Sequence, residues 1–288
     1  MQNTKKFLIQ KNKSLSDLST FGIGGKASYF TVCKSIDEMR LAYLFAREKT
    51  LPIIIVGKGS NTLFPDAGLD ALVIQNRIDF LEIDENRAHV GAGYSFSLLG
   101  SKTVRAGLSG LEFASGIPAS VGGAVFMNAG ANGCETKDHL VEVKYLDEDG
   151  EVKTYSKEEM TFTYRKSSFQ EMKGVIVGAT FELTLDPEAR DRQINIIEYR
   201  KKTQPLTEKS AGCVFRNPEG ISASKLIDEL GLKGKKVGGA MISPVHANFI
   251  VNTGNATQRD VLGLIEEVRD IVYKKEGVLL KDELRVIS

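Results

Sequence analysis

The sequence contains no tryptophan, and only three cysteines and three histidines among its 288 residues. The cysteine count is odd and no two cysteines form a C-x-x-C pair, which argues against a disulfide scaffold or a structural zinc site. The histidines are scattered, so neither a metal centre nor a Ser-His-Asp triad is supported. We therefore expect no bound metal, and a chain that works in a reducing compartment.

Long apolar runs and an excess of charge of one sign are also missing. The longest uninterrupted apolar stretches, such as 53–56, are far too short to span a bilayer, and the N-terminal segment lacks the apolar core of a signal peptide. Lys and Arg number 38 against 37 Asp and Glu, a formal charge of +1. This balance gives no global basic field for nucleic acid. We expect a cytoplasmic protein with neither a nucleic-acid nor a membrane partner.

The composition, 42% hydrophobic and 26% charged, is that of a folded chain with a sizeable core. Its patterning predicts an α+β fold. Helices are expected from Ser35 onward and over 97–106, 188–202, 222–230 and 257–276, with Ile194, Ile197 and Tyr199 as core residues of the third. Strands are expected at 51–56, within 71–91, at 140–146 and 151–155 as a hairpin, at 175–185, and at 278–287. We place a domain boundary near 187–203, giving domains 1–187 and 188–288.

Glycine is frequent, 28 residues, and it gathers at 22–25, 56–61 and 116–133. Glycine loops admit a close approach of a ligand to the backbone, although ordinary turns and tight core packing use them as well. The second loop follows an expected strand and could cradle a pyrophosphate with successive backbone amides. It is neither a Rossmann fingerprint nor a P-loop. The third run is too rich in glycine for a helix interior and suits a backbone that lies against a large flat ligand.

Six motifs in order give the chain a specific resemblance, from about residue 14 to the C-terminus. They are TFGIGGKA, GKGSN, GIPASVGGAVFMNAGA, YRKS, SAGCVFRNP and GVLLKDELR. Together they resemble the UDP-N-acetylenolpyruvoylglucosamine reductase family. The resemblance implies an FAD-binding domain of the vanillyl-alcohol-oxidase (PCMH) type, made of two α+β subdomains, and a C-terminal α+β substrate-binding domain. It also implies a role in peptidoglycan precursor synthesis.

By this resemblance FAD is held non-covalently by the glycine loops, with NADPH as co-substrate and a small UDP-sugar as substrate of a monomeric enzyme. The short segment between Arg165 and Cys213 resembles a subtype that lacks an extra loop with a substrate-capping tyrosine. The implied cofactor residues are Gly57, Lys58, Gly59, Ser60, Asn61, Gly116, Ile117, Pro118, Ser120, Gly122, Gly123, Asn128 and Gly130.

The resemblance also implies a catalytic trio, Arg165, Cys213 and Glu283. A guanidinium can grip a carboxylate with two hydrogen bonds and stabilise the charge that develops in an enolate-like intermediate. Cys213 stands where the family usually has a serine proton donor, and a thiol is a competent acid. Glu283, beside a substrate carboxylate, suits a proton-sharing role. The plainer alternatives are a surface ion pair, a buried inert thiol and a solvated glutamate.

Further side chains, some from these motifs and some outside them, are candidate substrate contacts, and four of them could offer cationic or donor groups to a diphosphate or a carboxylate. These candidate substrate contacts are Tyr164, Arg216, Asn217, Lys225, His246, Asn248 and Arg285. Two other functions stay open at this point. One is a flavin oxidase of the same fold that passes electrons to oxygen, and the other is a non-enzymatic nucleotide-binding regulator.

Overall fold

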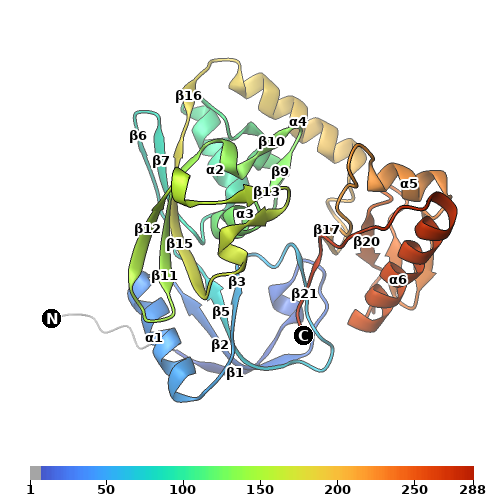
Figure 1. The fold of residues 1–288 in the computed structure, drawn as a ribbon, viewed down its shortest axis with the longest axis horizontal. Coiled ribbons are helices and arrows are strands. Elements are labelled where there is room, and N and C mark those ends of the chain that lie inside the picture. Colours follow the sequence, from blue (N-terminus) through green and yellow to red (C-terminus); the bar gives the residue numbers. More distant parts are fainter. Residues whose placement is uncertain (1–7) are drawn as a thin grey trace. The chain divides into compact units, whose positions relative to one another are not determined.

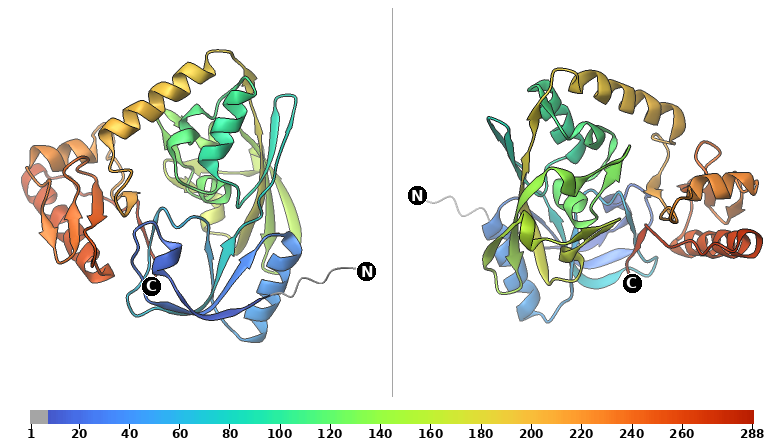
Figure 2. Two further views of the ribbon diagram at one scale, coloured as in Figure 1. Left: turned by 180° about the vertical axis from the view of Figure 1, so that it is seen from behind. Right: turned by 45° about the horizontal axis from the view of Figure 1, so that its top comes forward.

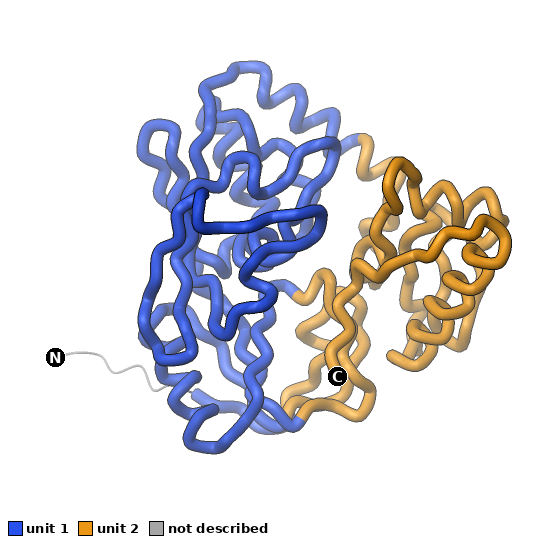
Figure 3. The backbone as a smooth tube through the Cα atoms, viewed as in Figure 1, with its two compact units in different colours: residues 1–12, 28–58, 70–198 blue, residues 13–27, 59–69, 199–288 orange. Residues whose placement is uncertain are grey.

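The computed structural model describes residues 8–288, which form two compact units (Figure 3). Unit 1 comprises the described residues through 12 together with 28–58 and 70–198, and unit 2 comprises 13–27, 59–69 and 199–288. Each unit therefore draws on separated stretches of the chain. The continuous domains 1–187 and 188–288 stay a prediction, and the compact units differ from them chiefly because 13–27 and 59–69 group with the C-terminal part.

A five-stranded antiparallel sheet is the centre of unit 1. Its order is β12-β11-β15-β7-β6, formed by Val152–Ser156, Leu140–Asp147, Gly174–Glu182, Arg87–Gly91 and Leu81–Asp84. The hairpin β11–β12 and the strands expected within 71–91 are confirmed. The central strand β15 is buried on both faces, since Ile176 enters one core cluster while Val175 and Val177 enter another.

The two faces of this sheet carry different layers, which Figures 1 and 2 show from three sides. One core packs it against helices α2 (Phe96–Arg105) and α3 (Val121–Phe126) and the 3₁₀ turn η2 (Glu112–Gly116). The other core contains helix α1 (Ile36–Glu48) and a four-stranded sheet of order β1-β2-β5-β3. Its strands are Gln10–Ser14, Lys26–Cys33, Leu69–Asn76 and Ile53–Val56.

The helix α3 corrects the expectation that the glycine-rich run avoids helix. The Ser120 side chain caps α3 by accepting a hydrogen bond from the backbone N–H of Gly123. The Gly122 amide donates to the Ala92 carbonyl at 2.8 Å, and a Cβ on Gly122 would lie 3.0 Å from the Ala92 side chain. Glycine is favoured at residue 122 because an added Cβ would be crowded by the Ala92 side chain.

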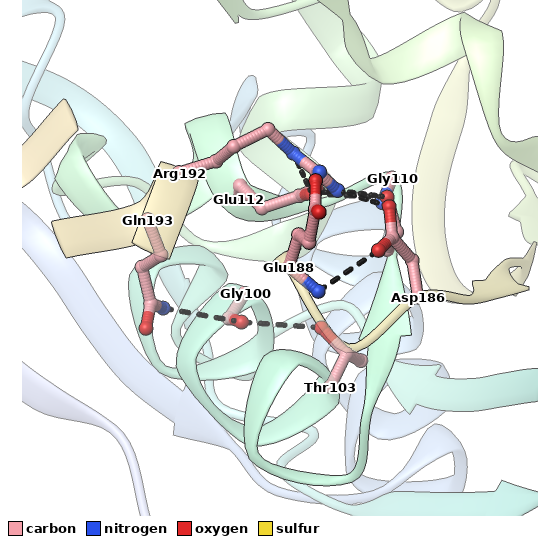
Figure 4. Close-up of polar contacts among 9 residues, drawn as sticks. Gly100, Thr103, Gly110, Glu112, Asp186, Glu188, Arg192 and Gln193 are labelled. Atoms are coloured by element: carbon pink, nitrogen blue, oxygen red, sulfur yellow. Dashed lines mark hydrogen bonds and ion pairs between the residues drawn. The ribbon is translucent and has the colours of Figure 1, made fainter. Parts of the chain in front are cut away.

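Helix α4 (Ala189–Thr203) begins in unit 1 and is held there by polar contacts (Figure 4). Arg192 donates to the carboxylates of Glu112, at 2.8 Å, and Asp186, at 2.6 Å. The fully buried Gln193 amide donates to the Ser115 hydroxyl at 2.6 Å. The expected core role of Ile194 and Tyr199 is wrong, since they are 38% and 60% exposed. The buried positions are Ala189 and Gln193, because the helix packs through a small residue and a satisfied amide.

Unit 2 is built on a second sheet of order β17-β20-β19-β18, with strands Ser210–Cys213, Phe249–Asn252, Ala240–Ile242 and Lys236–Val237. Helices α5 (Ala223–Glu229) and α6 (Gln258–Glu276) supply much of its core. The expected bounds of α6 are confirmed: Thr257 and Asp260 form a capping box, and Gly277 ends the helix in the left-handed conformation.

The expected strand over 278–287 is wrong in extent. Only β21 (Arg285–Val286) is a strand, paired in parallel with β4 (Thr62–Leu63). Upstream the chain runs irregularly, although Leu280 and Leu284 are buried. The remaining short elements are β8 (Leu108–Ser109), β9 (Gly130–Ala131), β10 (Cys134–Glu135), β13 (Phe162–Thr163), β14 (Lys166–Ser167), β16 (Thr184–Leu185) and the 3₁₀ turns η1 (Ser16–Leu18), η3 (Thr136–Asp138), η4 (Lys157–Glu159) and η5 (Ser168–Gln170).

The Glu112 carboxylate should stabilise unit 1 in a pH-dependent way. Burial raises its pKa, but hydrogen bonds from the Gly110 amide and Arg192 outweigh this and leave the pKa below its ordinary value. The stabilisation is therefore present above the unfolded pKa of about 4.3 and is lost as pH falls through the folded pKa. Because Arg192 is partly exposed, we expect Glu112→Gln to cost about 1 kcal/mol at pH 7 and much less at pH 3. Urea unfolding at both pH values measures this, with Glu188→Gln as the control; an equal cost at both would contradict it.

Candidate functional site

Three segments of unit 1 converge on Ser120. The backbone amides of Phe96, Val121 and Gly122 donate to the carbonyls of Ala119, Tyr94 and Ala92, at 2.8 to 3.0 Å. Residue 57 lies against the same point, since a Cβ on Gly57 would collide with the Ser120 hydroxyl oxygen. Gly57 and the run around Ser120, both predicted to bind the cofactor, are thus brought together, because the Ser120 side chain packs against Gly57.

Lys58 adds a cation to this region. Its ammonium donates to the Ser95 hydroxyl at 2.5 Å. Burial and then the neighbouring Arg77 lower the pKa of Lys58, while Asp79 opposes them. Within residues 8–288 the backbone N–H groups of Lys58, Gly59 and Ser60 donate to no other group. A left-handed glycine, φ +63° at Gly59, beside such amides is the geometry of an anion-binding nest.

Asn128, predicted to bind the cofactor, has its side chain hydrogen-bonded within the protein. It is fully buried, and its amide nitrogen donates to the Glu135 carboxylate at 3.0 Å and the Thr163 carbonyl at 3.1 Å. Its amide oxygen accepts from the Lys137 N–H at 3.1 Å. The side chain therefore braces the loop after α3 against strand β13.

Arg165 lies in the two-residue turn between β13 and β14, which pair through Thr163 and Lys166. It adopts φ +59°, a conformation that residues other than glycine and asparagine rarely take. Its guanidinium donates to the Gly130 carbonyl at 3.0 Å and lies 4.9 Å from the centre of the Tyr164 ring. The turn thus directs Arg165 toward the end of the glycine-rich run, with Tyr164 as a cation–π partner.

Cys213 is the last residue of β17 in unit 2. It pairs with Phe249 of β20, after an irregularity in register and the left-handed Gly212. The next amide, of Val214, donates to the Asn248 carbonyl at 2.9 Å. The thiol is half-buried, whereas Cys33 is fully buried and Cys134 is exposed.

Glu283 is brought to the segment that follows Cys213. Its backbone N–H donates to the Val214 carbonyl at 2.7 Å, and the Asn61 amide donates to the Glu283 carbonyl at 3.1 Å. The Arg285 N–H in turn donates to the Asn61 carbonyl at 3.2 Å. Asn61, predicted to bind the cofactor, thus fixes the segment that carries the predicted Glu283. Unit 2 therefore holds two of the predicted catalytic residues, and unit 1 holds Arg165.

The predicted substrate contacts of unit 2 have different surroundings. The Asn248 amide is buried and bonds both backbone groups of Phe215, at 2.9 and 2.8 Å, so it braces the chain after Cys213. The His246 Nδ1 accepts a hydrogen bond from the Asn248 N–H at 3.3 Å. Burial lowers the pKa of His246, and the nearby positive charge of Lys233 lowers it further.

The other four predicted contacts lie mostly at the surface of unit 2. Arg216 donates to the Asp282 carbonyl, and the Asn217 side chain accepts from the Ala223 amide. Lys225 is exposed and lies 3.7 Å from Glu229, one helical turn away. Arg285 lies in β21, both of whose residues are exposed.

Three residues of these regions were missed by sequence reasoning. Ser95 contacts Lys58, and Gln170 donates to the Arg165 carbonyl at 3.3 Å. Arg200 has a buried Nε without a hydrogen-bond partner, and burial lowers the pKa of Arg200 while the neighbouring Cys213 opposes that shift. None of them stands in a glycine loop or beside a predicted catalytic residue in sequence, so no local pattern marked them.

The described part of the chain contains no group of three or more His, Cys, Asp or Glu residues arranged to hold a metal ion. Among residues 8–288 there is also no helix with the length and apolar character needed to cross a bilayer.

Comparison with known proteins defines the class first. Residues 27–156 match the family described as "FAD binding domain", and residues 204–287 match "UDP-N-acetylenolpyruvoylglucosamine reductase, C-terminal domain". The chain is thus a flavin-dependent oxidoreductase with an FAD-binding domain of α+β structure.

The family follows from full-length relatives. The chain is 54% identical over 279 residues to the UDP-N-acetylenolpyruvoylglucosamine reductase of Protochlamydia amoebophila, covering 96% of this chain and 93% of that one. It is 46% identical to the reductase of Chlamydia trachomatis serovar A, covering 100% and 99%. The crystal structure of the reductase from Thermus caldophilus matches with a TM-score of 0.84 and 39% identity, covering 98% of this chain and all of that one. The chain belongs to the UDP-N-acetylenolpyruvoylglucosamine reductase family.

The residues around Ser120 fit FAD on their own chemistry. The Lys58 amide and ammonium suit a pyrophosphate, and the glycines at 57 and 122, where an added Cβ would be crowded, suit close approach of a large flat ligand.

The collision at residue 57 gives a direct test of this cofactor site. We expect Gly57→Ala to displace the loop from Ser120 at a cost of about 1–3 kcal/mol, which weakens FAD binding roughly 5- to 150-fold. Titration of the apo-protein with FAD, followed by flavin fluorescence, measures the dissociation constant.

Gly263→Ala in α6 is the matched control, because its added methyl meets only ordinary contacts. Adding Ser120→Ala to Gly57→Ala should recover part of the lost affinity, because it removes the colliding oxygen. Wild-type affinity of the Gly57→Ala protein would contradict the placement of the cofactor at this loop.

Proposed function

We propose that this protein catalyses the NADPH-dependent reduction of UDP-N-acetylglucosamine enolpyruvate to UDP-N-acetylmuramate, a step of peptidoglycan precursor synthesis. The observation that carries the proposal is the 54% identity, along nearly the whole of both chains, to a relative named for this reductase activity. FAD bound at the loops around Ser120 supplies hydride transfer from NADPH to the methylene carbon of the enolpyruvyl group. We place the enzyme in the cytoplasm as a monomer.

Arg165 is our candidate for the substrate carboxylate. As hydride reaches the methylene carbon, negative charge moves toward the carboxylate, and a fixed guanidinium stabilises that charge without reorganising. A planar guanidinium also suits bidentate contact with a carboxylate. The turn geometry, the contact with Gly130 and the neighbouring Tyr164 ring support this assignment because they limit how Arg165 can move.

Cys213 is our candidate for the proton donor. The carbon that bears the ether oxygen must gain a proton as the carbanion character disappears, and the thiol can give it. Glu283, whose backbone is bonded to the residue after Cys213, would share a proton with the substrate carboxylate or with the donor. We assign the remaining candidates to binding of the diphosphate and sugar, with Asn248 acting indirectly through Phe215. These candidates are Arg216, Asn217, Lys225, His246, Asn248 and Arg285.

An anaerobic experiment tests the reaction itself. The purified protein is reduced with one equivalent of NADPH, and the enolpyruvyl substrate is then added. The visible absorbance band of the oxidised flavin is followed over time. Rapid return of the oxidised spectrum is the expected result. A flavin that stays reduced until oxygen is admitted would favour an oxidase, and a protein that binds no FAD would contradict the family-based function.

Replacement of Cys213 tests the proton donor. We expect Cys213→Ala to leave flavin reduction by NADPH nearly unchanged and to slow reoxidation by the substrate about 10²- to 10⁴-fold, the usual contribution of a general acid. Cys213→Ser should keep much of the activity, because a hydroxyl can donate the same proton. Cys134→Ala is the matched control, since that thiol is exposed. Equal losses in both half-reactions, measured by stopped flow, would remove Cys213 from this role.

A further inference from the structure

The turn that carries Arg165 requires support from outside itself. A left-handed arginine has no side-chain amide to stabilise that conformation locally, and the pairing of β13 with β14 spans only two residues on each side. Turns of this kind persist where neighbouring groups hold them. Side chains outside the turn must therefore fix it.

Gln170, in the 3₁₀ turn η5, contacts the arginine turn directly. Its side-chain nitrogen donates to the Arg165 carbonyl at 3.3 Å and to the Phe126 carbonyl at 2.8 Å, and it also lies 3.7 Å from the Met127 sulfur. Phe126 is the last residue of α3, the helix in the glycine-rich run. One amide group thus ties the arginine turn to the end of the helix that begins at Ser120.

Two other side chains hold the flanks of the turn but not its arginine carbonyl. Ser167 donates to the same Phe126 carbonyl at 2.7 Å, and Asn128 donates to the Thr163 carbonyl at 3.1 Å. These bonds fix the strand on each side of the turn. Gln170 differs because it bonds the carbonyl of Arg165 itself and so fixes the orientation of the peptide that follows the left-handed residue.

The geometry points to Gln170 as the positioning residue for Arg165, fixing the guanidinium relative to the segment 116–130. This inference rests on the proposed role of Arg165 toward the substrate carboxylate. Gln170 itself touches neither substrate nor cofactor in this scheme. It acts by donating two hydrogen bonds, so its effect depends on donor capacity rather than on size.

Three substitutions separate donor capacity from size. Gln170→Met keeps the length and removes both donors, Gln170→Glu keeps the shape and faces two carbonyl oxygens with an acceptor, and Gln170→Lys restores donors to both carbonyls. Gln193→Met is the matched control, because it removes the fully buried amide that donates to Ser115, away from the turn.

The readouts are stopped-flow half-reactions, substrate affinity of the oxidised protein by calorimetry, and Tm. We expect Gln170→Met and Gln170→Glu to slow substrate-dependent reoxidation about 10- to 100-fold, as a misplaced catalytic group does, and to weaken substrate binding. Flavin reduction by NADPH should be unchanged, and Gln170→Lys should stay close to the wild type. Gln193→Met should lower Tm without altering reoxidation.

The outcomes distinguish this inference from the proposed function. If the wild-type protein reoxidises with the substrate and Gln170→Met does so equally fast with equal substrate affinity, Gln170 has no positioning role. If all three Gln170 variants lose both half-reactions together with Tm, its role is structural and the inference is overturned. If the wild-type protein itself does not reoxidise, the proposed function fails instead.

Discussion

Close packing around Ser120, through its main chain and its side chain, is the constraint on which the arrangement of unit 1 depends. Residues 92–96 bond to 119–122 through main-chain groups, and the loop at Gly57 lies against Ser120 with no space for a Cβ. Backbone amides can face a flat anionic cofactor only where side chains do not intervene. The same packing makes α3 a short helix capped by Ser120, and so sets where its end at Phe126 lies.

Amide side chains connect the end of α3 to the segments around it by hydrogen bonds. Gln170 and Asn128 connect the helix end and the loop after it to the turn of Arg165, and each uses both hydrogens of its amide. Unit 2 uses the same device, with Asn61 bonded to the Glu283 carbonyl and Asn248 bonded to both backbone groups of Phe215. A neutral amide satisfies buried carbonyls without the desolvation cost of a charge, so it can hold a segment rigidly beside reactive groups.

The fold could be predicted where local signals and core packing agree. The capping residue Thr257 and the apolar stripe of Val261, Leu264 and Val268 predicted α6, and the turn signal at 147–150 predicted the hairpin β11–β12. Prediction failed where tertiary contacts override local preference, as in the glycine-containing helix α3 and the polar buried face of α4 at Gln193. For the site, motifs marked the residues but not their tasks: Asn61, Asn128 and Asn248 brace the backbone, which only long-range contacts reveal.

Partly buried cations show how a chain of nearly balanced charge can still bind an anionic ligand. The formal charge is only +1, yet burial lowers the pKa of Lys58 and Arg200. Partly removing a cation from water costs free energy, and the Arg200 guanidinium stays charged at neutral pH because its ordinary pKa lies so far above it. An anionic ligand that binds the cation offsets this free energy by charge-assisted hydrogen bonds, as both the FAD pyrophosphate and a UDP-sugar diphosphate can. Local placement of a few cations, rather than a basic surface, is therefore what fits this chain to nucleotide-bearing molecules.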